Sequence, residues 1–393
     1  MKRIYLDHAA TTAVDSEVMQ AMAPYFAEAF GNASSLHSFG KDASRALGAA
    51  RQTVADALGA GMGEIFFTSG GTESDNLALK GVMMAGGVGR GERGHIITSA
   101  IEHPAILNTC RYLEGAGHGC DVTYIPVGSD GLVDPGDVAD AIRDDTKLIS
   151  IMHANNEIGT IQPIAEIGAI ARKNGVLFHT DAVQSFGKTE IDLRKIPVDM
   201  LSLSSHKIYG PKGVGALYVR DGVEIAPLMH GGGHESGLRA GTENVAGIVG
   251  FAKAAMLAIE RFAPDCSHLT KLRDMLIKGT IAAIDDVHLN GHPTERLPNN
   301  ANLRFDFVEG EAMLLHLDVK GIAVSTGSAC SSASSEPSHV LLALGLAPEE
   351  IHGSIRFTLG RENTEEEILY VLDVLPEIVG KLRAISPIAG GKR

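Results

Sequence analysis

One lysine stands where a strand is expected to end and a rigid turn to begin. Lys207 follows Ser204-Ser205-His206 behind the apolar segment Met200–Leu203, and Gly210-Pro211-Lys212-Gly213 comes next. A lysine held in such a place and partly desolvated is suited to form a Schiff base with an aldehyde, because desolvation favours the neutral amine. An ordinary surface lysine is the alternative, and Lys207 alone does not decide against it.

An aspartate closes another predicted strand. Asp181 ends the segment Val176–Asp181, and the carboxyl end of a buried strand is where open α/β sheets bind their ligands. A carboxylate there can keep a pyridinium nitrogen protonated, which makes the ring an electron sink; a helix N-cap is the simpler interpretation. Asp181 and Lys207 end two successive predicted strands with a helix-sized gap between them. Pyridoxal 5'-phosphate (PLP) enzymes of the aminotransferase type share this arrangement, so PLP is the expected cofactor.

A glycine-containing turn could bind the phosphate of that cofactor. The segment Thr68-Ser69-Gly70-Gly71-Thr72 leads from a predicted strand into a predicted helix. Free backbone N–H groups and a hydroxyl at such a helix start form an anion site. A turn of this kind is weak evidence alone, and it gains weight because PLP has one phosphate to bind.

One of the four cysteines lies among small residues. Cys330 is part of Thr326-Gly327-Ser328-Ala329-Cys330-Ser331-Ser332, a segment with too little side chain to pack firmly, so we expect an accessible and mobile thiol. A nucleophilic thiol that travels to a substrate needs that setting. The alternative is a serine-rich surface loop with an incidental thiol. The other cysteines, Cys110, Cys120 and Cys266, are expected to be buried small hydrophobes.

An arginine lies inside an apolar, strand-like segment. Arg356 stands in Ser354-Ile355-Arg356-Phe357-Thr358. A buried guanidinium favours a planar anion, and the carboxylate of a substrate would fit it in a bidentate way. A structural ion pair with one of the 48 acidic residues is the alternative, and without further context it is favoured.

Apolar and amphipathic segments alternate up to about Tyr218, which predicts an α/β fold with a mostly parallel sheet covered on both faces. After the glycine-rich Gly231–Gly241, a helical pattern extends from about Glu243 to Phe262, and the remainder predicts a smaller α+β domain. The predicted strands are Glu64–Thr68, His95–Thr98, Val122–Ile125, Leu148–His153, Val176–His179, Met200–Leu203 and Val214–Val219. The predicted helices between them are Glu73–Met84, Pro104–Glu114, Pro135–Arg143 and Ile164–Lys173.

The composition excludes several classes of function. The 393 residues have a formal net charge of -14, which repels phosphate backbones and argues against nucleic acid as a partner. No secretory signal and no membrane-spanning segment is expected, so the predicted location is cytoplasmic. The cysteines are far apart, which argues against a disulfide framework and against a zinc site. No metal site is predicted; Cys330 alone could transiently ligate a cluster iron.

Together these segments reveal a family resemblance. The sequence resembles the group I cysteine desulfurases, of the NifS/IscS type, along almost the whole chain. The matching stretches, in order, are Tyr5–Thr12, Gly31–Ser35, Thr68–Asn76, Ile101–His103, Asn155–Gly159, His179–Ser185, Ser204–Gly215, Met229–Thr242, Gly327–Ser332 and Ser354–Arg361. A single match would be unspecific, whereas so many in the same order are highly specific.

The resemblance implies an aminotransferase-like PLP enzyme of fold type I that works as a homodimer. A large PLP-binding domain would comprise residues 14–258. A small domain would comprise residues 1–13 together with 259–393 and would carry the mobile cysteine loop at about 325–337. The implied reaction converts L-cysteine to L-alanine and transfers the sulfur to Cys330 as a persulfide, from which it passes to an acceptor such as a U-type iron–sulfur scaffold protein.

The resemblance also implies a role for each matching residue. Lys207 would bind PLP as a Schiff base, His103 would stack on the ring and move protons, and Cys330 would accept the sulfur. Arg356 and Asn155 would bind the substrate carboxylate. The implied cofactor contacts are Lys207, Asp181 at the ring nitrogen, Gln184 at the ring hydroxyl, His103, Asn155, and Gly71, Thr72, Ser204 and His206 around the phosphate, joined by Thr242 of the neighbouring subunit.

Two other classes of function are alternatives. A selenocysteine lyase, an aminotransferase or another fold-type I PLP enzyme would share the cofactor site, although an aminotransferase needs no mobile cysteine. A degenerate PLP fold that serves as an assembly scaffold would be expected to lack Lys207, Arg356 or Cys330, and all three are present. The chain ends soon after Ser386-Pro387, without the longer tail with which bacterial relatives dock the scaffold protein, so the docking mode is open.

Overall fold

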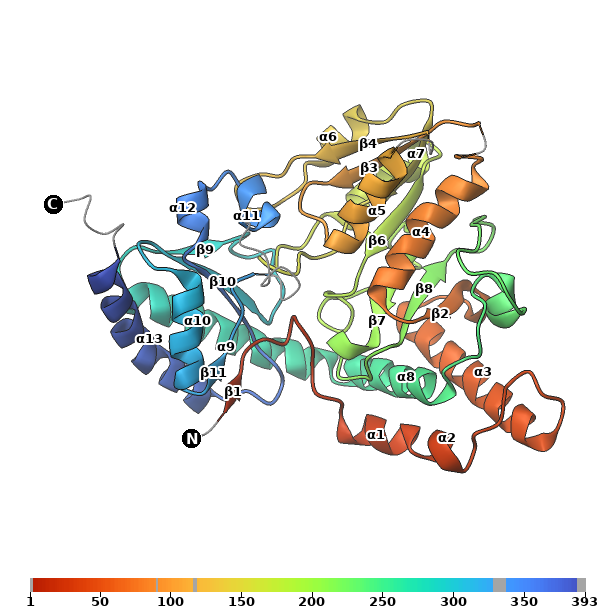
Figure 1. Ribbon diagram of the computed structural model, residues 1–393, viewed down its shortest axis with the longest axis horizontal. Helices are drawn as coiled ribbons and strands as arrows, with labels where there is room; N and C mark the ends of the chain where they lie inside the picture. The colour runs from red at the N-terminus through yellow and green to blue at the C-terminus, as the bar shows by residue number, and fades with distance from the viewer. Residues whose placement is uncertain (1–2, 90, 116–118, 328–336, 387–393) are drawn as a thin grey trace.

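Seven strands form the central sheet (Figure 1). A computed structural model describes residues 3–89, 91–115, 119–327 and 337–386. In sheet order the strands are β2 (Ile65–Thr68), β8 (Gly215–Val219), β7 (Met200–Ser204), β6 (Leu177–Asp181), β5 (Thr146–Ser150), β3 (Gly94–Ser99) and β4 (Cys120–Ile125). Strand β8 is antiparallel to β2 and β7, and the other pairs are parallel. This arrangement confirms the predicted α/β fold with a mostly parallel sheet.

The central strands are apolar on both faces because helices cover both. Ile97 and Leu201 belong to one hydrophobic core, whereas Ile96 and Met200, directly before them, belong to another, as the two-residue period of a strand requires. The helices that contribute to the first core are α1 (Ser16–Met22), α3 (Ser38–Leu58), α6 (Pro135–Asp140), α7 (Ile164–Lys173) and α8 (Val245–Glu260). The second core contains residues of α4 (Gly71–Ala85) and α5 (Pro104–Glu114).

The C-terminal part of the chain forms its own layer beside the large sheet (Figure 1). Its antiparallel sheet has the order β12 (Ser354–Thr358), β10 (Asn300–Phe305) and β9 (Val287–Asn290). Helices α9 (Phe262–Ala283), α10 (Gly310–Val319) and α13 (Glu365–Ile385) share a third hydrophobic core with this sheet. Between α10 and β12, the chain also forms two short helices, α11 (His339–Ala343) and α12 (Pro348–Ile351). The division into domains at residues 13/14 and 258/259 stays a prediction.

The N-terminus belongs to this second layer. Strand β1 (Ile4–Tyr5) pairs in parallel with β11 (Ile322–Ala323), and Ile4 and Leu6 lie in the same core as the C-terminal strands. The chain then crosses to α1 (Ser16–Met22) and α2 (Pro24–Ala27), which contact α8. Residues 7–12 therefore lie between the two layers. Short 3-10 helices cover Met62–Glu64, Ser205–Lys207 and His234–Gly237.

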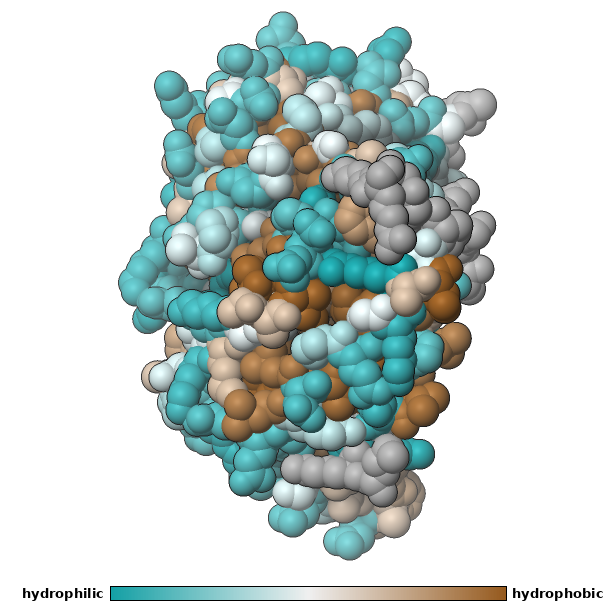
Figure 2. Space-filling view, turned by 90° about the vertical axis from the view of Figure 1, so that its left-hand side faces the viewer, coloured by the Kyte–Doolittle hydropathy of each residue, from teal (hydrophilic) through white to brown (hydrophobic). Residues whose placement is uncertain are grey.

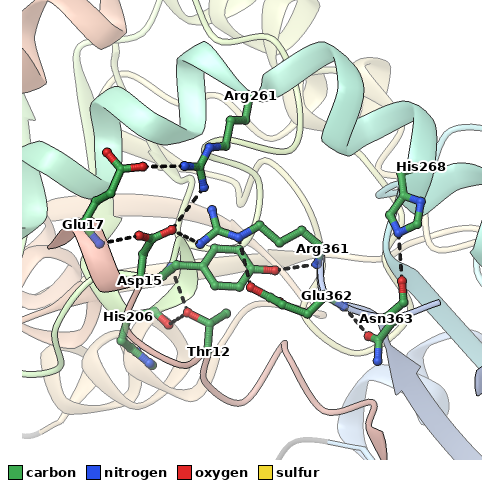
Figure 3. Close-up of polar contacts among 11 residues, drawn as sticks. Thr12, Asp15, Glu17, His206, Arg261, His268, Arg361, Glu362 and Asn363 are labelled. Carbon is green, nitrogen blue, oxygen red and sulfur yellow. Dashed lines mark hydrogen bonds and ion pairs between the residues drawn. The ribbon is translucent and has the colours of Figure 1, made fainter. Parts of the chain in front are cut away.

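A group of polar side chains joins the two layers at the junction of α8 and α9 (Figure 3). The carboxylate of Asp15 accepts hydrogen bonds from Arg261, which separates the two helices, and from Arg361, which follows β12. The Arg361 guanidinium also lies over the Tyr209 ring, 3.9 Å from its centroid. The helical segment predicted from about Glu243 to Phe262 is α8, and ion pairs of Arg261 hold the junction at which α9 begins.

Sequence reasoning left the region before residue 64 without predicted helices. The structure places α1, α2 and the long α3 there, and His37, the N-cap of α3, accepts the Gly40 N–H at Nδ1. The other predicted strands and helices lie where they were expected, with ends that differ by a few residues. Within the described residues, no helix is long and apolar enough to cross a membrane.

The outer surface of the second layer is partly apolar. Figure 2 shows hydrophobic residues gathered on the face that lies on the side of α13. Leu315 and Val319 on α10 and Leu369 on α13 are each exposed by more than half, at 64%, 73% and 56%. Helices α10 and α13 therefore bury one apolar side in the core and expose further apolar residues outward.

A buried glutamate ties together the ends of two parallel strands. Glu102 follows β3, and its Oε1 accepts hydrogen bonds from Ser99 Oγ at 2.7 Å and from the Met152 N–H at 2.9 Å, beyond β5. Its Oε2 has no hydrogen-bond partner within the described residues. Burial raises the pKa of Glu102 to about 8, so that the neutral acid predominates at neutral pH.

Replacing Glu102 by Gln should preserve the fold and reduce its sensitivity to alkaline pH. Gln can accept both hydrogen bonds at Oε1 and matches the neutral acid in shape. Because the folded-state pKa lies above the unfolded value of 4.5, the wild type loses stability as the pH rises from there through about 8. The difference between the thermal unfolding midpoints of Glu102→Gln and the wild type should therefore shift by several degrees in favour of the variant between about pH 5 and about pH 8.5. A difference that stays constant over this range would contradict a protonated Glu102.

Candidate active site

A cavity of about 200 Å³ lies at the carboxyl ends of β6 and β7. Because these strands are parallel and in register, with Asp181 opposite Ser202, the segments that follow them meet at one edge of the sheet. Most of the residues singled out in the sequence line this cavity: Gly71, Thr72, His103, Asp181, Gln184, Ser204, His206, Lys207 and Arg356. A larger, open hollow of about 820 Å³ lies at the amino ends of β5 and β6, away from these side chains.

The position of Lys207 is fixed by a tight turn. Residues Ser205–Lys207 form a single 3-10 turn directly after β7, and a Cβ on Gly210 would lie only 1.9 Å from Ser205 Oγ, so the turn requires glycine there. Lys207 Nζ donates hydrogen bonds to the carbonyl oxygens of Ala9 and Ala10, the latter at 2.9 Å. The amine therefore faces the segment that crosses between the two layers.

Asp181 lies at the cavity wall with little access to water. It is 6% exposed, and its Oδ1 accepts the Val183 N–H at 2.8 Å. Burial raises the pKa of Asp181 to about 6, and the charge of Lys207 opposes that rise. A cation in the cavity would favour the ionised carboxylate. Gln184 lies three residues further along the chain, and its Nε2 donates a hydrogen bond to the same Ala9 carbonyl that accepts one from Lys207.

The start of α4 provides an anion site at another wall. Gly71 and Thr72 open this helix of 15 residues, and the first N–H groups of a helix have no partner inside it. A Cβ on Gly71 would lie 2.6 Å from Val183 Cγ2, so a larger residue there would require the Val183 side chain to move. Ser204 and His206 line the same cavity. Burial and the charge of Lys207 lower the pKa of His206 to about 4, so its ring is neutral.

His103 is the N-cap residue of α5. Its Nδ1 accepts the Ala105 N–H at 3.1 Å, which leaves the ring proton on Nε2 when the imidazole is neutral. Burial, followed by the charge of Lys207, lowers the pKa of His103 to about 4. At neutral pH the cavity thus contains an uncharged imidazole that carries an exchangeable proton on Nε2.

Arg356 reaches the cavity from the second layer. Its side chain is 2% exposed, its Nη2 donates to Asp7 Oδ1 at 2.8 Å, and its Nη1 donates to the Asn156 carbonyl at 2.9 Å. Among the described residues, the buried Nε has no hydrogen-bond partner. The guanidinium is therefore held in place with a donor available for a further anion.

The structure places Asn155 outside the lining of the cavity. Its carboxamide is already used, because Nδ2 donates to the Ile101 carbonyl and Oδ1 accepts the N–H groups of Glu157 and Ile158. Asn155 does not line the cavity, whereas its neighbour Asn156 does. The asparagine pair was visible in the sequence, but which of its members faces the cavity depends on the backbone direction.

Two other predicted residues lie elsewhere. Thr242 is exposed, beside a separate hollow that also includes Phe26 and Phe30. Cys330 lies outside the described residues. On either side of it, Ser325 exchanges backbone hydrogen bonds with Arg356, at 2.7 and 3.2 Å, and Ser338 Oγ donates to Glu157 Oε2 at 2.6 Å. The described segments that flank Cys330 are thus tied to the residues next to the cavity.

Sequence reasoning missed a second buried acid at the cavity. Asp75 lines it from α4, is 1% exposed, and has an Oδ1 without a hydrogen-bond partner among the described residues. Burial, then the nearby charge of Asp181, raises its pKa well above the usual value. Its position four residues after Gly71, one turn into α4, was the only signal in the sequence. Met152 and the Ala9-Ala10 backbone were missed as well, because they contribute shape and carbonyl groups rather than reactive side chains.

These groups fit PLP. The amine of Lys207 suits its aldehyde, the carboxyl of Asp181 suits its ring nitrogen, and the start of α4 with Ser204 suits its phosphate. Arg356 lines the same cavity, and its guanidinium suits the carboxylate of an amino acid bound there. Within the described residues, no group of His, Cys, Asp or Glu side chains could hold a metal ion.

Comparison with known proteins agrees with this site. Residues 4–371 match the model of the class-V aminotransferase family. The chain is 57% identical over 387 residues to the cysteine desulfurase IscS of Methanosarcina thermophila, covering 98% of this chain and 94% of that relative. A solved NifS-like protein superposes with a TM-score of 0.90 at 41% identity, covering 97% of this chain and all of the other. A structure described as SspA in complex with cysteine has a TM-score of 0.81 at 40% identity, covering 92% and 100%. The chain therefore belongs to the class-V aminotransferase family of PLP-dependent enzymes and, within it, to the cysteine desulfurases of the NifS/IscS type.

Proposed function

We propose that the protein uses PLP to convert L-cysteine to L-alanine and transfers the sulfur to Cys330 as a persulfide. The observation that supports this function best is the single cavity that gathers Lys207, Asp181 and Arg356. An amine for an aldehyde, an acid for a ring nitrogen and a guanidinium for a carboxylate together suit an amino acid bound to PLP. The naming of the relatives, and the cysteine in the SspA structure, point to L-cysteine as that amino acid.

The residues that would hold the cofactor are those that line the cavity. Lys207 would bind it covalently, Asp181 would hold a proton at its ring nitrogen, and Gln184 would contact the ring hydroxyl. His103 would stack on the ring, and the phosphate would lie at Gly71, Thr72, Ser204 and His206. When bound, PLP supplies an electron sink for the bonds around the substrate Cα.

Arg356 and Asn156 would orient the substrate. The Arg356 guanidinium, which lines the cavity, would donate to the substrate carboxylate. Asp7 and the Asn156 carbonyl hold the guanidinium from the other side, so the arginine does not have to reorganise on binding. The Cα proton would move to Lys207 Nζ, and the neutral His103 would exchange its Nε2 proton with the substrate.

Cys330 would take the sulfur. Its thiolate attacks the sulfur of the substrate, an S–S bond forms while the substrate C–S bond breaks, and the three-carbon fragment leaves as alanine after it gains protons. L-Cysteine and the Cys330 thiol thus give L-alanine and a persulfide, with no external oxidant. An aminotransferase has no need for this thiol, so the Cys330 segment favours the desulfurase over that alternative.

Mass spectrometry after incubation with L-cysteine tests this function. The wild-type protein should gain one sulfur, on the peptide that contains Cys330, and release alanine. Cys330→Ser should bind cysteine, seen as a change in cofactor absorbance, but lose persulfide formation completely. Lys207→Ala should lose both the stable yellow colour and the reaction. Persulfide formation in Cys330→Ser, or a wild type that forms none, would refute the proposal.

We further propose that the enzyme is a homodimer whose cofactor sites are completed by Thr242 of the neighbouring subunit. Three aromatic side chains near the hollow that contains Thr242 are exposed by more than half: Phe26 at 68%, Phe30 at 65% and Phe39 at 51%. Leu36, at 89% exposed, extends this surface. A twofold interface that buries these residues would bring Thr242 from one subunit toward the phosphate site of the other.

Mixed dimers can test whether Thr242 acts on the neighbouring site. Thr242→Val should weaken PLP binding at least about tenfold, because a hydrogen bond to a charged phosphate is lost. In a dimer of one Thr242→Val subunit and one Lys207→Ala subunit, one site would combine an intact Lys207 with the partner's intact Thr242. That mixed dimer should recover one normal site, measured as half of the wild-type PLP content at limiting PLP. No recovery would show that Thr242 acts within its own subunit, and a Thr242→Val homodimer that binds PLP as tightly as the wild type would show that Thr242 has no role at the phosphate.

The sulfur acceptor that we propose is a U-type scaffold protein for iron–sulfur clusters, in the cytoplasm, where thiols stay reduced. Persulfide labelled with ³⁵S at Cys330 should transfer to such a scaffold when the two proteins are mixed. The label should remain on the enzyme when the scaffold cysteines are alkylated beforehand, which serves as the control. Retention of the label in the presence of the intact scaffold would exclude this acceptor.

A further inference from the structure

A buried glutamate anchors the segment His234–Thr242 to the large sheet. The side chain of Glu235 is 3% exposed, and its two oxygens accept hydrogen bonds from the Arg51 guanidinium at 2.6 and 2.7 Å. Its Oε2 also accepts the Phe67 N–H in β2 at 2.8 Å. Phe67 directly precedes the turn Thr68–Thr72, so the segment is fixed beside the strand that leads into the proposed phosphate site.

The backbone at this anchor is strained. Glu235 and Ser236 both have a left-handed conformation, with φ of 47° and 57°, and Gly237 continues it with a φ of 83°. Residues with a Cβ adopt this conformation at a cost, and they keep it where the surrounding contacts impose it, often at functional sites. The direction in which the chain leaves the anchor is therefore set by the contacts of Glu235 rather than by local preference.

Arg239 makes a second link, on the other side of the phosphate turn. Its Nε donates to Glu73 Oε1 at 2.8 Å and its Nη2 donates to Glu73 Oε2 at 3.2 Å, and the two side chains are 23% and 18% exposed. Glu73 Oε2 also accepts the Ser69 N–H at 2.8 Å. This bidentate ion pair therefore closes the turn that lines the cavity with Gly71 and Thr72.

A carboxylate next to a phosphate site needs a compensating charge. Glu73 follows Thr72 directly and lies in the first turn of α4, whose positive end favours its carboxylate and the phosphate alike. A phosphate monoester carries close to two negative charges at neutral pH, so the two anions repel each other. Of the described residues that line the cavity, Lys207 and Arg356 would bind the aldehyde and the substrate carboxylate, and His206 is neutral because its pKa is about 4. A cation outside the cavity lining has to compensate the glutamate.

We propose that Arg239 is a positioning residue for the cofactor phosphate: it holds the Glu73 carboxylate at the Ser69 N–H and cancels its charge beside the phosphate site. The inference rests on the proposed function, in which the phosphate of PLP lies at this turn. Loss of the Arg239 charge should weaken the binding of PLP and spare that of pyridoxal, which has the same ring and aldehyde but no phosphate. Because the effects of separate charges on the phosphate add, removing the Glu73 charge as well should restore PLP binding.

The test compares the dissociation constants of PLP and pyridoxal for the full-length apoprotein, measured by absorbance titration. Arg239→Gln should bind PLP about fivefold or more weakly than the wild type, because an uncompensated carboxylate then lies next to the phosphate. Its affinity for pyridoxal should stay within about twofold of the wild-type value. The double variant Glu73→Gln/Arg239→Gln should bind PLP within about twofold of the wild type, since Gln can still accept the Ser69 N–H.

Arg220→Gln is the matched control. Arg220 Nε donates to Asp199 Oδ1 at 2.7 Å, and Asp199 Oδ2 accepts the Phe178 N–H at 2.8 Å. This pair repeats the arrangement of Arg239 and Glu73, but it lies at the amino ends of β6 and β7, whereas the cavity lies at their carboxyl ends. The control variant should bind both PLP and pyridoxal with wild-type affinity.

Three results would overturn the proposal: wild-type PLP affinity in Arg239→Gln, an equal loss for PLP and pyridoxal, or a double variant that binds PLP no better than Arg239→Gln. If Arg239→Gln alone does not fold, the same change is measured in the Glu73→Gln background, where it should weaken PLP binding by the same factor. Equal PLP affinity of Glu73→Gln and the double variant would then decide against the proposal. A wild-type apoprotein that binds neither PLP nor pyridoxal would instead refute the proposed function itself.

Discussion

The segment of residues 7–12 holds the candidate active site together. Asp7 binds the Arg356 guanidinium, the Ala9 carbonyl accepts from both Lys207 and Gln184, and Thr12 contacts the His206 carbonyl through its N–H and its hydroxyl. This segment crosses between the large sheet and the second layer. Arg356 belongs to the second layer and Lys207 to the first, so the segment sets their relative positions. Because these contacts are made, the Lys207 amine and the Arg356 guanidinium face one cavity.

Acidic and basic side chains are both buried around this cavity. Burial raises the pKa of Asp181 and Glu102, and it lowers the pKa of His103 and His206. Neutral forms of acids and bases thus become accessible near neutral pH, which is the condition for moving protons between them. The same groups reduce stability, because each must be protonated or deprotonated against its preference on folding. The large hydrophobic cores on both sides of the sheet offset that cost.

Several features were predictable from residue patterns because they depend on local sequence. The seven strands of the large sheet were visible as short apolar segments, since strands buried on both faces cannot alternate polar and apolar residues. Pro104 and Pro135 marked two helix starts, where the missing N–H costs little. Asp181 and Lys207 could be paired because the ends of parallel neighbouring strands lie at one edge of a sheet. Helix α3 was missed although its buried residues recur at helical spacing, because four of the seven are Gly or Ala and give a weak apolar signal.

By itself, the sequence determined the reactive residue types, the order of strands and helices between residues 64 and 219, and, through the family resemblance, the cofactor and the reaction. Only the tertiary structure decided that Asn156 rather than Asn155 faces the cavity, and that Asp75 stands beside the predicted groups. It also decided that the first strand pairs with β11, more than 300 residues later in the chain. The physical reason is the same in each case: these features depend on which backbone groups meet across distant segments, and side-chain type does not encode the direction of approach.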